Sequence, residues 1–309
     1  MRKYFAGFIM TYERPDILAS TIHKIFEQSL APEKLIIVDN SESHLTRNLI
    51  EQMNDPRLEY VAVGYNAGPA GAAKIGLSKL ISEGYDWIYW GDDDDPPRIT
   101  HAFEILLSIP DKINEEKIGA LGLTGNRFDI GTAVFTKIPN AELKGIVEVD
   151  SIAGNNTFII SGKAARRCDL PNPELFFGLE ELDYCLSLRK GGFKLFVDGD
   201  TYYALRERAK KHIRDTPVSD FTRLSFDIRS NNLWREYYSI RNLIFLMSKK
   251  CNNSPVAMLV IIKSLVKGLI SFRRGIKFGF VYSRLTMFAI LDAVTGKMGK
   301  TFSSDSFKL

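Results

Sequence analysis

Four consecutive carboxylates, Asp92 to Asp95, are the residues of this chain best suited to chemistry. Adjacent like charges repel one another, and a buried carboxylate without a partner is costly, so such a run persists where water or a hard cation takes up its charge. The apolar run Trp87–Trp90 precedes the aspartates, and Pro96-Pro97 follows them. Because open α/β sheets bind ligands at the carboxyl ends of their strands, this placement favours a binding site over a solvated acidic loop.

A second acidic group, Glu180, Glu181 and Asp183, opens a predicted helix that ends near Gly191-Gly192. A carboxylate at this place can act as a general base. Alternatively, the two glutamates only favour the helix N-terminus through its dipole.

The elements around these residues alternate between strand and helix patterns. Buried strands are predicted at 4–10, 34–38, 58–63 and 87–90, with helical stretches after each of the first three. Further strands are predicted at 118–124, 157–160 and 193–197, with helices at 101–117, 162–168 and 183–190, whereas 126–150 indicates only a hairpin or flap. This alternation predicts an α/β protein with a doubly wound parallel sheet.

The charge is unevenly distributed along the 309 residues. Residues 1–201 contain 21 Lys or Arg and 30 Asp or Glu, whereas residues 202–309 contain 20 and 7. A basic C-terminal part suggests an anionic partner. The three cysteines form no C-x-x-C pair, which argues against a disulfide framework or zinc site and favours the cytoplasm.

The C-terminal part, from about Leu233, is predicted to be helical. Its apolar helices carry Lys263, Lys267, Arg273, Arg274 and Lys277. This pattern fits peripheral binding to an anionic membrane surface, with a helical cap or a dimer interface as the alternative. No stretch of eighteen or more uncharged apolar residues occurs, so a membrane-spanning helix is not expected.

The order of motifs resembles the GT-A fold glycosyltransferases of family 2, in particular the bacterial rhamnosyl- and galactofuranosyltransferase branch. The resemblance covers nearly the whole chain, and each motif alone is weak. The matching segments are Thr11–Pro15 (T-x-N-R-P), Val38–Ser41 (V-D-N-x), Asn66–Gly71 (N-x-G-x-x-G), the acidic run (D-x-D), Glu180–Asp183 with Leu188–Gly192 (E-D-x-D-L…R…G), Tyr237–Asn242 (Y-Y-x-x-R-N) and the basic tail Leu291–Lys300.

This resemblance implies a GT-A domain over residues 1–232, with a mostly parallel sheet, and a helical basic extension over 233–309. It also implies an inverting transfer of rhamnose or galactofuranose from a UDP- or dTDP-sugar to a glycan or lipid-linked glycan in cell-surface polysaccharide synthesis. The expected protein is cytoplasmic, with peripheral contact to the inner face of the membrane or self-association through its C-terminal helices.

The resemblance further implies a site with Mn²⁺ or Mg²⁺, hard cations that take oxygen ligands. Asp92 and Asp94 would hold the metal, with Asp92 nearer the ribose, and Asp93 would lie beside the nucleotide. A register one residue later is the alternative. His212 lies in a basic stretch and is either a further metal ligand or a surface or phosphate-facing residue.

The catalytic base would be Glu181, where the family has Asp, and Asp183 would orient the acceptor or the helix. The expected nucleotide contacts also include Thr11, Glu13, Arg14, Asp39, Asn66, Gly68 and Gly71. Glu13 stands where the family has Asn. Asp39 could instead be an ordinary turn residue, and the two glycines could serve only the loop. Trp90 could stack on a sugar or pack in the core.

Three other functions would require features that the sequence lacks or that fit it less well. A nucleotidyl- or sugar-phosphate transferase would carry a glycine-rich basic loop after the first strand, and Thr11–Pro15 has no glycine. A glycosidase also uses two carboxylates, but the D-x-D and the nucleotide-type sheet argue against it. A non-enzymatic anionic-surface or nucleic-acid-binding protein would rely on the basic tail, which has no RNA-recognition signature.

Overall fold

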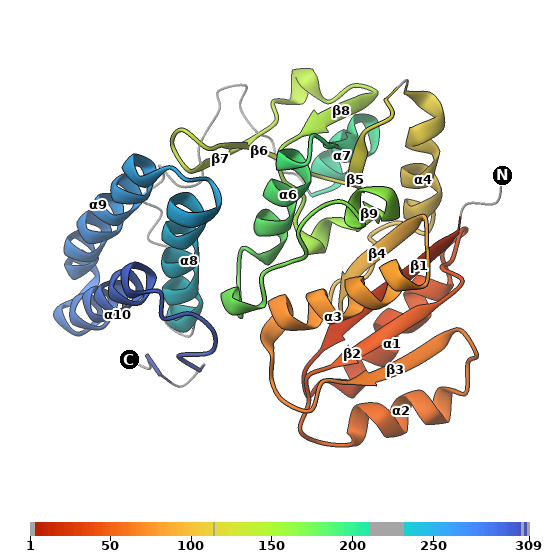
Figure 1. Cartoon of the computed structure of the whole chain (residues 1–309), viewed down its shortest axis with the longest axis horizontal. Helices are drawn as coiled ribbons and strands as arrows, with labels where there is room; N and C mark the ends of the chain where they lie inside the picture. The colour runs from red at the N-terminus through yellow and green to blue at the C-terminus, as the bar shows by residue number, and fades with distance from the viewer. Residues whose placement is uncertain (1–3, 114, 210–231, 304–305, 308–309) are drawn as a thin grey trace.

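The computed structural model describes residues 4–113, 115–209, 232–303 and 306–307 (Figure 1). An eight-stranded sheet with strand order β3-β2-β1-β4-β9-β5-β10-β8 forms its centre, and β6 and β7 form a separate hairpin. The strands are β1 Phe5–Thr11, β2 Leu35–Asp39, β3 Leu58–Ala62, β4 Trp87–Asp92, β5 Ile118–Gly122, β6 Asn126–Asp129, β7 Val134–Lys137, β8 Ile146–Val149, β9 Phe158–Ser161 and β10 Lys194–Asp198.

The sheet is mostly parallel, as predicted. β1 pairs in parallel with β2 and β4, β2 with β3, and β5 with β10. β9 lies antiparallel between β4 and β5, and β8 is an antiparallel edge strand. The segment expected only as a hairpin or flap therefore contributes both β8 and the β6–β7 hairpin.

Helices cover both faces of the sheet, because its buried strands are apolar on both sides. α1 and α4 pack on one face, and α3, α5 and α6 pack on the other. Trp90 is fully buried beside Phe8, Phe158 and Tyr184, so it packs in the core and is not available to stack on a sugar. The helices of this part are α1 Pro15–Phe26, α2 Leu45–Met53, α3 Gly68–Ser82, α4 Ala102–Lys112, α5 Gly162–Ala165, α6 Glu180–Lys190 and α7 Gly199–Arg208.

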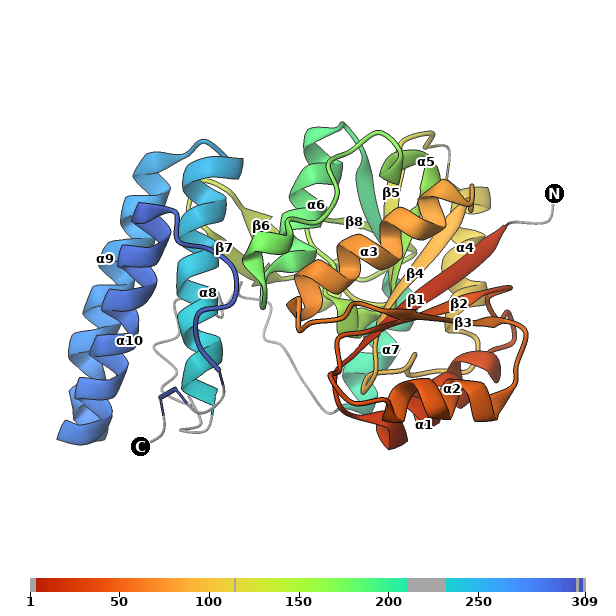
Figure 2. The same ribbon diagram turned by 60° about the horizontal axis from the view of Figure 1, so that its bottom comes forward.

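A helical region begins at Leu233 and stands beside the sheet. It consists of α8 Leu233–Phe245, α9 Ser254–Ile270 and α10 Ile276–Thr295. In both ribbon views α8 lies between the α9–α10 pair and the rest of the molecule (Figures 1 and 2). After α10 the chain turns back towards the sheet, so the tail lies between α8 and the sheet domain (Figure 2).

Among the described residues, two helical segments are long and apolar enough to cross a membrane, by length and composition alone. Ser254–Arg274 has a mean hydropathy of 1.8, and Ile276–Thr295 has 1.2. Each is partly covered by the protein, with 33% and 44% of its apolar window buried. Both segments contain Lys or Arg, so neither is a wholly uncharged stretch of eighteen residues.

The parallel register brings the predicted site residues to one edge of the sheet. Met10 lies opposite Asp92, and Thr11 lies opposite Asp39. The carboxyl ends of β1, β2 and β4 therefore meet, which is where ligands bind in sheets of this kind.

Candidate active site

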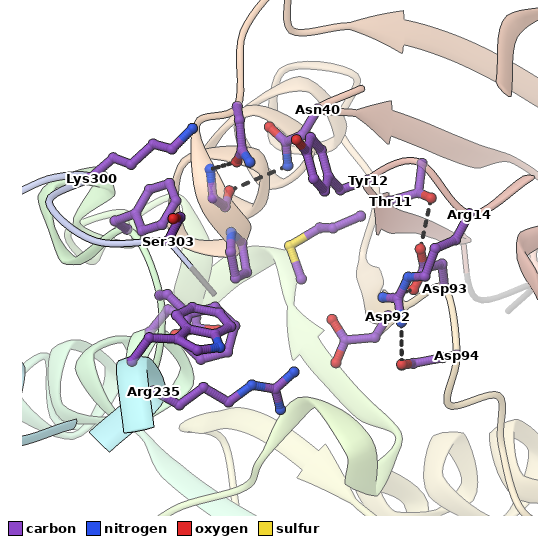
Figure 3. A pocket seen from close by; sticks show the side chains of 18 of the residues that line it. Thr11, Tyr12, Arg14, Asn40, Asp92, Asp93, Asp94, Arg235, Lys300 and Ser303 are labelled. Carbon is purple, nitrogen blue, oxygen red and sulfur yellow. Dashed lines mark hydrogen bonds and ion pairs between the residues drawn. The ribbon is translucent and has the colours of Figure 1, made fainter. Parts of the chain in front are cut away.

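A pocket of about 570 Å³ opens at this edge and extends to the C-terminal helical region (Figure 3). Its walls come from the β1–α1 loop, the acidic run, the start of α6, α8 and the tail. Residues lining it include Thr11, Tyr12, Arg14, Asn40, Asn66, Gly68, Asp92, Asp93, Asp94, Phe176, Phe177, Glu180, Trp234, Arg235, Lys300 and Ser303.

The acidic run separates into carboxylates with different partners. Asp93 is fully buried, where its carboxylate accepts a hydrogen bond from Thr11 Oγ1 at 2.7 Å and pairs with Arg14. The other end of the Arg14 guanidinium pairs with Asp94 at 2.6 Å. Asp92, Asp93 and Asp94 all line the pocket, whereas Asp95 does not. The register Asp92-x-Asp94 stays a prediction, and Asp93 is anchored by Thr11 and Arg14.

Asp92 is in an environment that opposes its ionisation. Burial, followed by the charges of Glu181 and the neighbouring aspartates, raises the pKa of Asp92 to about 8. Burial also raises the pKa of Asp93, against the lowering effects of Thr11 and Arg14. A carboxylate cluster of this kind is suited to a cation.

The β1–α1 loop contributes three of its residues to the pocket: Thr11, Tyr12 and Arg14. Thr11 and Arg14 also hold Asp93, so they position the acidic run. Glu13 does not line the pocket. Its carboxylate accepts hydrogen bonds from the backbone N–H groups of Glu42 and Ser43 at 2.8 and 3.0 Å, and so joins the β1–α1 loop to the β2–α2 loop.

Asp39 is buried beneath the pocket and not exposed in it. Its two carboxylate oxygens accept hydrogen bonds from Ser41 N and Tyr60 Oη, each at 2.9 Å. The next residue, Asn40, lines the pocket in its place and accepts a hydrogen bond from Ala67 N at 3.2 Å.

Asn66 and Gly68 line the pocket at the N-terminus of α3. Gly68 has φ +69, and a Cβ on it would come within 2.2 Å of Phe176 O, so only glycine fits there. Gly71 lies one turn further along α3, away from the pocket lining, where a Cβ would meet the Cβ of Ala67 at 2.6 Å.

The two glutamates that open α6 face different cavities. Glu180 lines the main pocket, and its buried Oε2 has no hydrogen-bond partner among the residues that the structure describes. Glu181 lines a second pocket of about 280 Å³, together with Lys137, Ser151 and Ala153. Glu181 Oε1 accepts a hydrogen bond from Gly154 N at 2.9 Å. Burial raises the pKa of both glutamates, and for Glu180 the charge of Glu181 adds to this effect.

Asp183, in the first turn of α6, lines neither of these cavities. It is 2% exposed, accepts a hydrogen bond from Asn172 N at 2.9 Å, and forms an ion pair with Lys250. Lys250 Nζ also donates to Ser187 Oγ at 2.6 Å. These contacts tie the first turn of α6 to Asn172 and Lys250, and the role of Asp183 in orienting the helix or the acceptor stays a prediction.

The metal-ligand prediction rests on Asp92 and Asp94 alone. His212 lies outside the residues that the structure describes. Within the described part of the chain, no group of three or more His, Cys, Asp or Glu side chains is arranged to hold a metal. Two carboxylates suffice where a donor's phosphates complete the shell of Mg²⁺ or Mn²⁺.

Arg241 and Asn242 hold the loop before α6, and Arg241 also joins that loop to the C-terminal tail. The Arg241 side chain is fully buried and donates to Leu175 O at 2.9 Å and to Gly299 O at 2.8 Å. Asn242 Nδ2 donates to the carbonyls of residues 175, 177 and 178, just before α6. The Y-Y-x-x-R-N segment therefore supports the loop that presents the glutamates.

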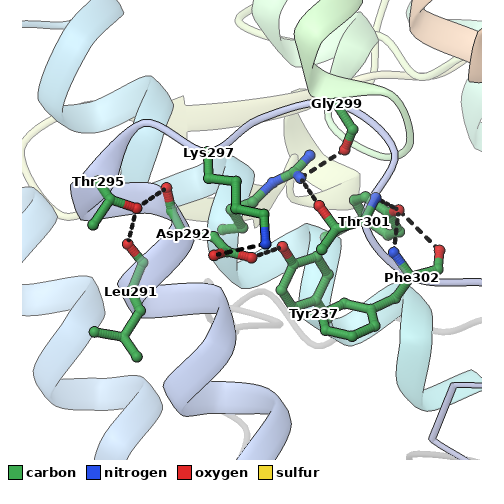
Figure 4. A network of polar contacts seen from close by, with 10 residues as sticks. Tyr237, Leu291, Asp292, Thr295, Lys297, Gly299, Thr301 and Phe302 are labelled. Carbon is green, nitrogen blue, oxygen red and sulfur yellow. Dashed lines mark hydrogen bonds and ion pairs between the residues drawn. The ribbon is translucent and has the colours of Figure 1, made fainter.

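Tyr237 and Tyr238 secure the rest of the tail. Tyr237 Oη donates to Asp292 at 2.6 Å (Figure 4), and Tyr238 Oη accepts from Thr301 N and Phe302 N at 3.0 and 3.1 Å. We call the tail segment 299–302, which these contacts hold against α8, the strap. The strap brings Lys300 to the pocket, where Lys300 and Arg235 lie across from the acidic run (Figure 3).

Pocket residues outside the predicted site include Tyr12, Asn40, Glu180, Arg235 and Lys300. Tyr12, Asn40 and Glu180 are sequence neighbours of predicted site residues, so the motifs around them were a usable signal. Lys300 ends the basic-tail motif, but no residue pattern near Arg235 or Lys300 shows that tertiary packing of the helical region brings them to the pocket.

A family profile described as glycosyl transferase family 2 matches residues 8–170, more than half of the chain. The chain belongs to glycosyl transferase family 2. The matched part includes the β1–α1 loop and the acidic run and ends before α6.

Curated relatives match over shorter stretches. Galactofuranosyltransferase GlfT1 of Mycolicibacterium smegmatis is 32% identical over 100 residues, which are 32% of this chain and 33% of that protein. GlfT1 of Mycobacterium tuberculosis (H37Rv) is 27% identical over 116 residues, 37% of this chain and 38% of that protein. Succinoglycan biosynthesis protein ExoO of Rhizobium meliloti is 26% identical over 138 residues, 42% and 39% of the two chains. The chain thus covers less than half of each relative.

The fold has solved counterparts. S. aureus TarS in complex with UDP-GlcNAc is 14% identical, with a TM-score of 0.50 over 94% of this chain and 81% of that one. The GT-A fold predicted from the sequence is confirmed.

Proposed function

We propose that this family 2 protein is a metal-dependent inverting glycosyltransferase. It transfers a sugar from a nucleotide-diphosphate donor, UDP- or dTDP-linked, to a glycan or lipid-linked glycan in cell-surface polysaccharide synthesis. One observation carries the proposal: the carboxylates of Asp92 and Glu181 both approach Gly154. Asp92 lines the large pocket, and Glu181 lines the smaller one.

The names of the relatives support the sugar and the pathway class. Two of them are galactofuranosyltransferases, and one is a succinoglycan biosynthesis protein. We therefore propose galactofuranose as the transferred sugar, with rhamnose as the second candidate from the sequence motifs.

Asp92 and Asp94 would hold Mn²⁺ or Mg²⁺. The residues fit such an ion, since they are two hard oxygen donors in a cluster whose ionisation is opposed until a cation compensates it. The bound ion would supply Lewis-acid support for the departing diphosphate. The ion pair with Arg14 would orient the Asp94 carboxylate.

Glu181 would be the general base. It accepts the proton of the acceptor hydroxyl as that oxygen bonds to the anomeric carbon and the bond from that carbon to the diphosphate breaks. The raised pKa of the buried carboxyl makes it a stronger base than a solvated glutamate. The hydrogen bond from Gly154 N fixes one of its oxygens at 2.9 Å. The smaller pocket would then admit the acceptor.

The nucleotide would lie against Tyr12, Asn40 and Asn66, which line the end of the pocket near β2 and α3. Lys300 and Arg235 would face its negative charge from the helical region. Residues 1–232 would form the catalytic domain, and 233–309 a helical extension that completes the pocket. The proposed location is the cytoplasm, at the inner face of the membrane.

The test is release of the nucleoside diphosphate from UDP- and dTDP-sugars by purified protein with Mn²⁺ or Mg²⁺. Asp94→Ala and Glu181→Gln should each lower turnover by about 10²–10⁴-fold, while circular dichroism shows that both variants stay folded. Asp95→Asn is the matched control and should keep activity near wild type. Full transfer activity in Glu181→Gln would remove it as the base, and release of pyrophosphate in place of a nucleoside diphosphate would indicate a nucleotidyltransferase.

A further inference from the structure

Many exposed apolar side chains lie on the α9–α10 pair. In the described part of the chain, eleven of the eighteen exposed large hydrophobic residues lie between Met258 and Val294. On α9, Met258, Ile262, Leu265 and Leu269 recur at helical spacing and are 40–72% exposed. These positions form one stripe along α9.

The second stripe runs along α10. Ile276, Phe280, Met287 and Leu291 are 48–73% exposed, and Arg284 lies in the same stripe. The opposite side of α10 is buried, with Tyr282, Leu285 and Ala289 in the core shared with α8. Each helix is therefore apolar on both sides, and the protein covers only one of them.

The exposed charge of this surface has a single sign. In the sequence, α9, α10 and their connection carry six Lys or Arg and one acidic residue, Asp292, which is buried on α10. Arg273, Arg274 and Lys277 are exposed at the turn between the two helices, around the exposed Ile276. An apolar surface bordered by cations and free of acids matches the headgroup region of an anionic bilayer.

The structure assigns this α9–α10 surface to docking on an anionic lipid membrane. The inference deepens the proposed membrane location by naming the face and the lipid chemistry, and it does not depend on the donor or the reaction.

Two alternatives fit less well. A second copy of the chain packed on the same face would bring like charges together with no acid to offset them, which opposes a two-fold contact. A spanning hairpin would have to leave α8. The Glu236 carboxylate ties both helices to α8, through Lys267 Nζ at 2.5 Å and Tyr282 Oη at 2.7 Å.

Because α8 also carries Arg241 and Asn242, the docking surface is rigidly linked to the loop before α6. Docking at this face would therefore hold the catalytic pocket in one orientation to the lipid surface, as a lipid-linked acceptor requires.

The experiment is cosedimentation of the full chain, without donor or metal, with vesicles of phosphatidylcholine alone or mixed with phosphatidylglycerol. Wild type should bind only the anionic vesicles, and added salt should release it. The double variant Arg273→Glu/Lys277→Glu should weaken binding by about thirtyfold or more. Ile276→Ser/Phe280→Ser should weaken it by a comparable factor through lost apolar contact.

Matched controls carry the same kinds of change elsewhere. Lys24→Glu/Lys144→Glu and Leu45→Ser alter exposed residues outside the surface and should bind as wild type does. Equal binding by wild type and both surface variants would overturn the inference, as would failure of wild type to bind anionic vesicles. Protein that high salt and alkaline carbonate cannot extract would indicate a spanning hairpin. A dimer in ultracentrifugation that both surface variants dissociate would indicate a protein interface.

The nucleoside diphosphate assay separates this inference from the proposed function. The surface variants should retain turnover with a soluble acceptor while losing vesicle binding. Vesicle binding by an inactive Glu181→Gln protein should equal that of wild type.

Discussion

The carboxylates of Asp92 and Glu181 converge on a single glycine, Gly154. A Cβ added to Gly154 would lie 2.8 Å from Glu181 Oε1 and 3.3 Å from Asp92 Oδ2. These two carboxylates, from the end of β4 and the start of α6, can both approach residue 154 because it has no side chain.

Gly154→Ala should therefore impair catalysis more than folding. The backbone of Gly154 is not in the left-handed region, so alanine fits the main chain, but its methyl group must displace the Glu181 carboxylate. We expect turnover to fall by about 10–100-fold, with the same circular dichroism spectrum. Gly268→Ala is the control, since a Cβ there meets only Ser283 at ordinary contact distance. Wild-type turnover in Gly154→Ala would contradict the proposed base position.

Asp92→Asn should stabilise the metal-free protein at alkaline pH. The folded-state pKa of Asp92, about 8, lies above the ordinary value of 3.8, so the folded chain retains a proton that the unfolded chain loses. The contribution of the Asp92 carboxyl to the free energy of unfolding is therefore complete below pH 4 and is lost as the pH rises through 8. Asparagine does not ionise, so at pH 8–9 we expect a Tm about 3–6 °C above that of wild type.

The comparison needs two conditions, a lower pH and added metal. At pH 5 the difference in Tm between Asp92→Asn and wild type should shrink. Adding Mn²⁺ at pH 8 should raise the Tm of wild type and not that of the variant. A metal response in Asp92→Asn equal to that of wild type would mean that Asp92 is not a ligand.

Lys300→Ala should weaken binding of the nucleotide diphosphate without destabilising the protein. Lys300 is an exposed residue of the tail whose side chain lies at the pocket, opposite the acidic run. Loss of one cation near the diphosphate should raise the Kd for UDP or dTDP by about tenfold, measured by calorimetry with Mn²⁺. Lys297→Ala removes a cation three residues away that does not line the pocket, and it should leave the Kd unchanged. Equal affinities in the two variants would place the diphosphate elsewhere.

Arg241→Lys should lower the free energy of unfolding by about 2–4 kcal/mol. A lysine cannot reach both Leu175 O and Gly299 O, so a buried carbonyl loses its partner. Urea unfolding followed by tryptophan fluorescence measures this loss. Arg235→Lys, on the exposed side of the same helix, should change the stability by less than about 0.5 kcal/mol. A Kd for UDP that rises together with the lost stability would show that the strap also positions Lys300.

Much of the fold follows from the sequence. The alternation of buried strands and amphipathic helices over residues 4–92 indicated a parallel sheet, and the structure has one. The antiparallel placement of β9 between β4 and β5 was not predictable, because strand direction depends on which neighbours pair across the sheet and not on the local residue pattern.

The site divides in the same way. Carboxylates at the end of β4 and the start of α6 could be predicted from the sequence, because strand ends and helix starts depend on residues close along the chain. Which of these carboxylates have protein partners depends on the folded chain. Asp93 is held by Thr11 and Arg14, and Asp183 by Lys250, partners more than sixty residues away in the chain. A carboxylate's partners are set by folding in three dimensions, and they determine whether its charge is available to a ligand.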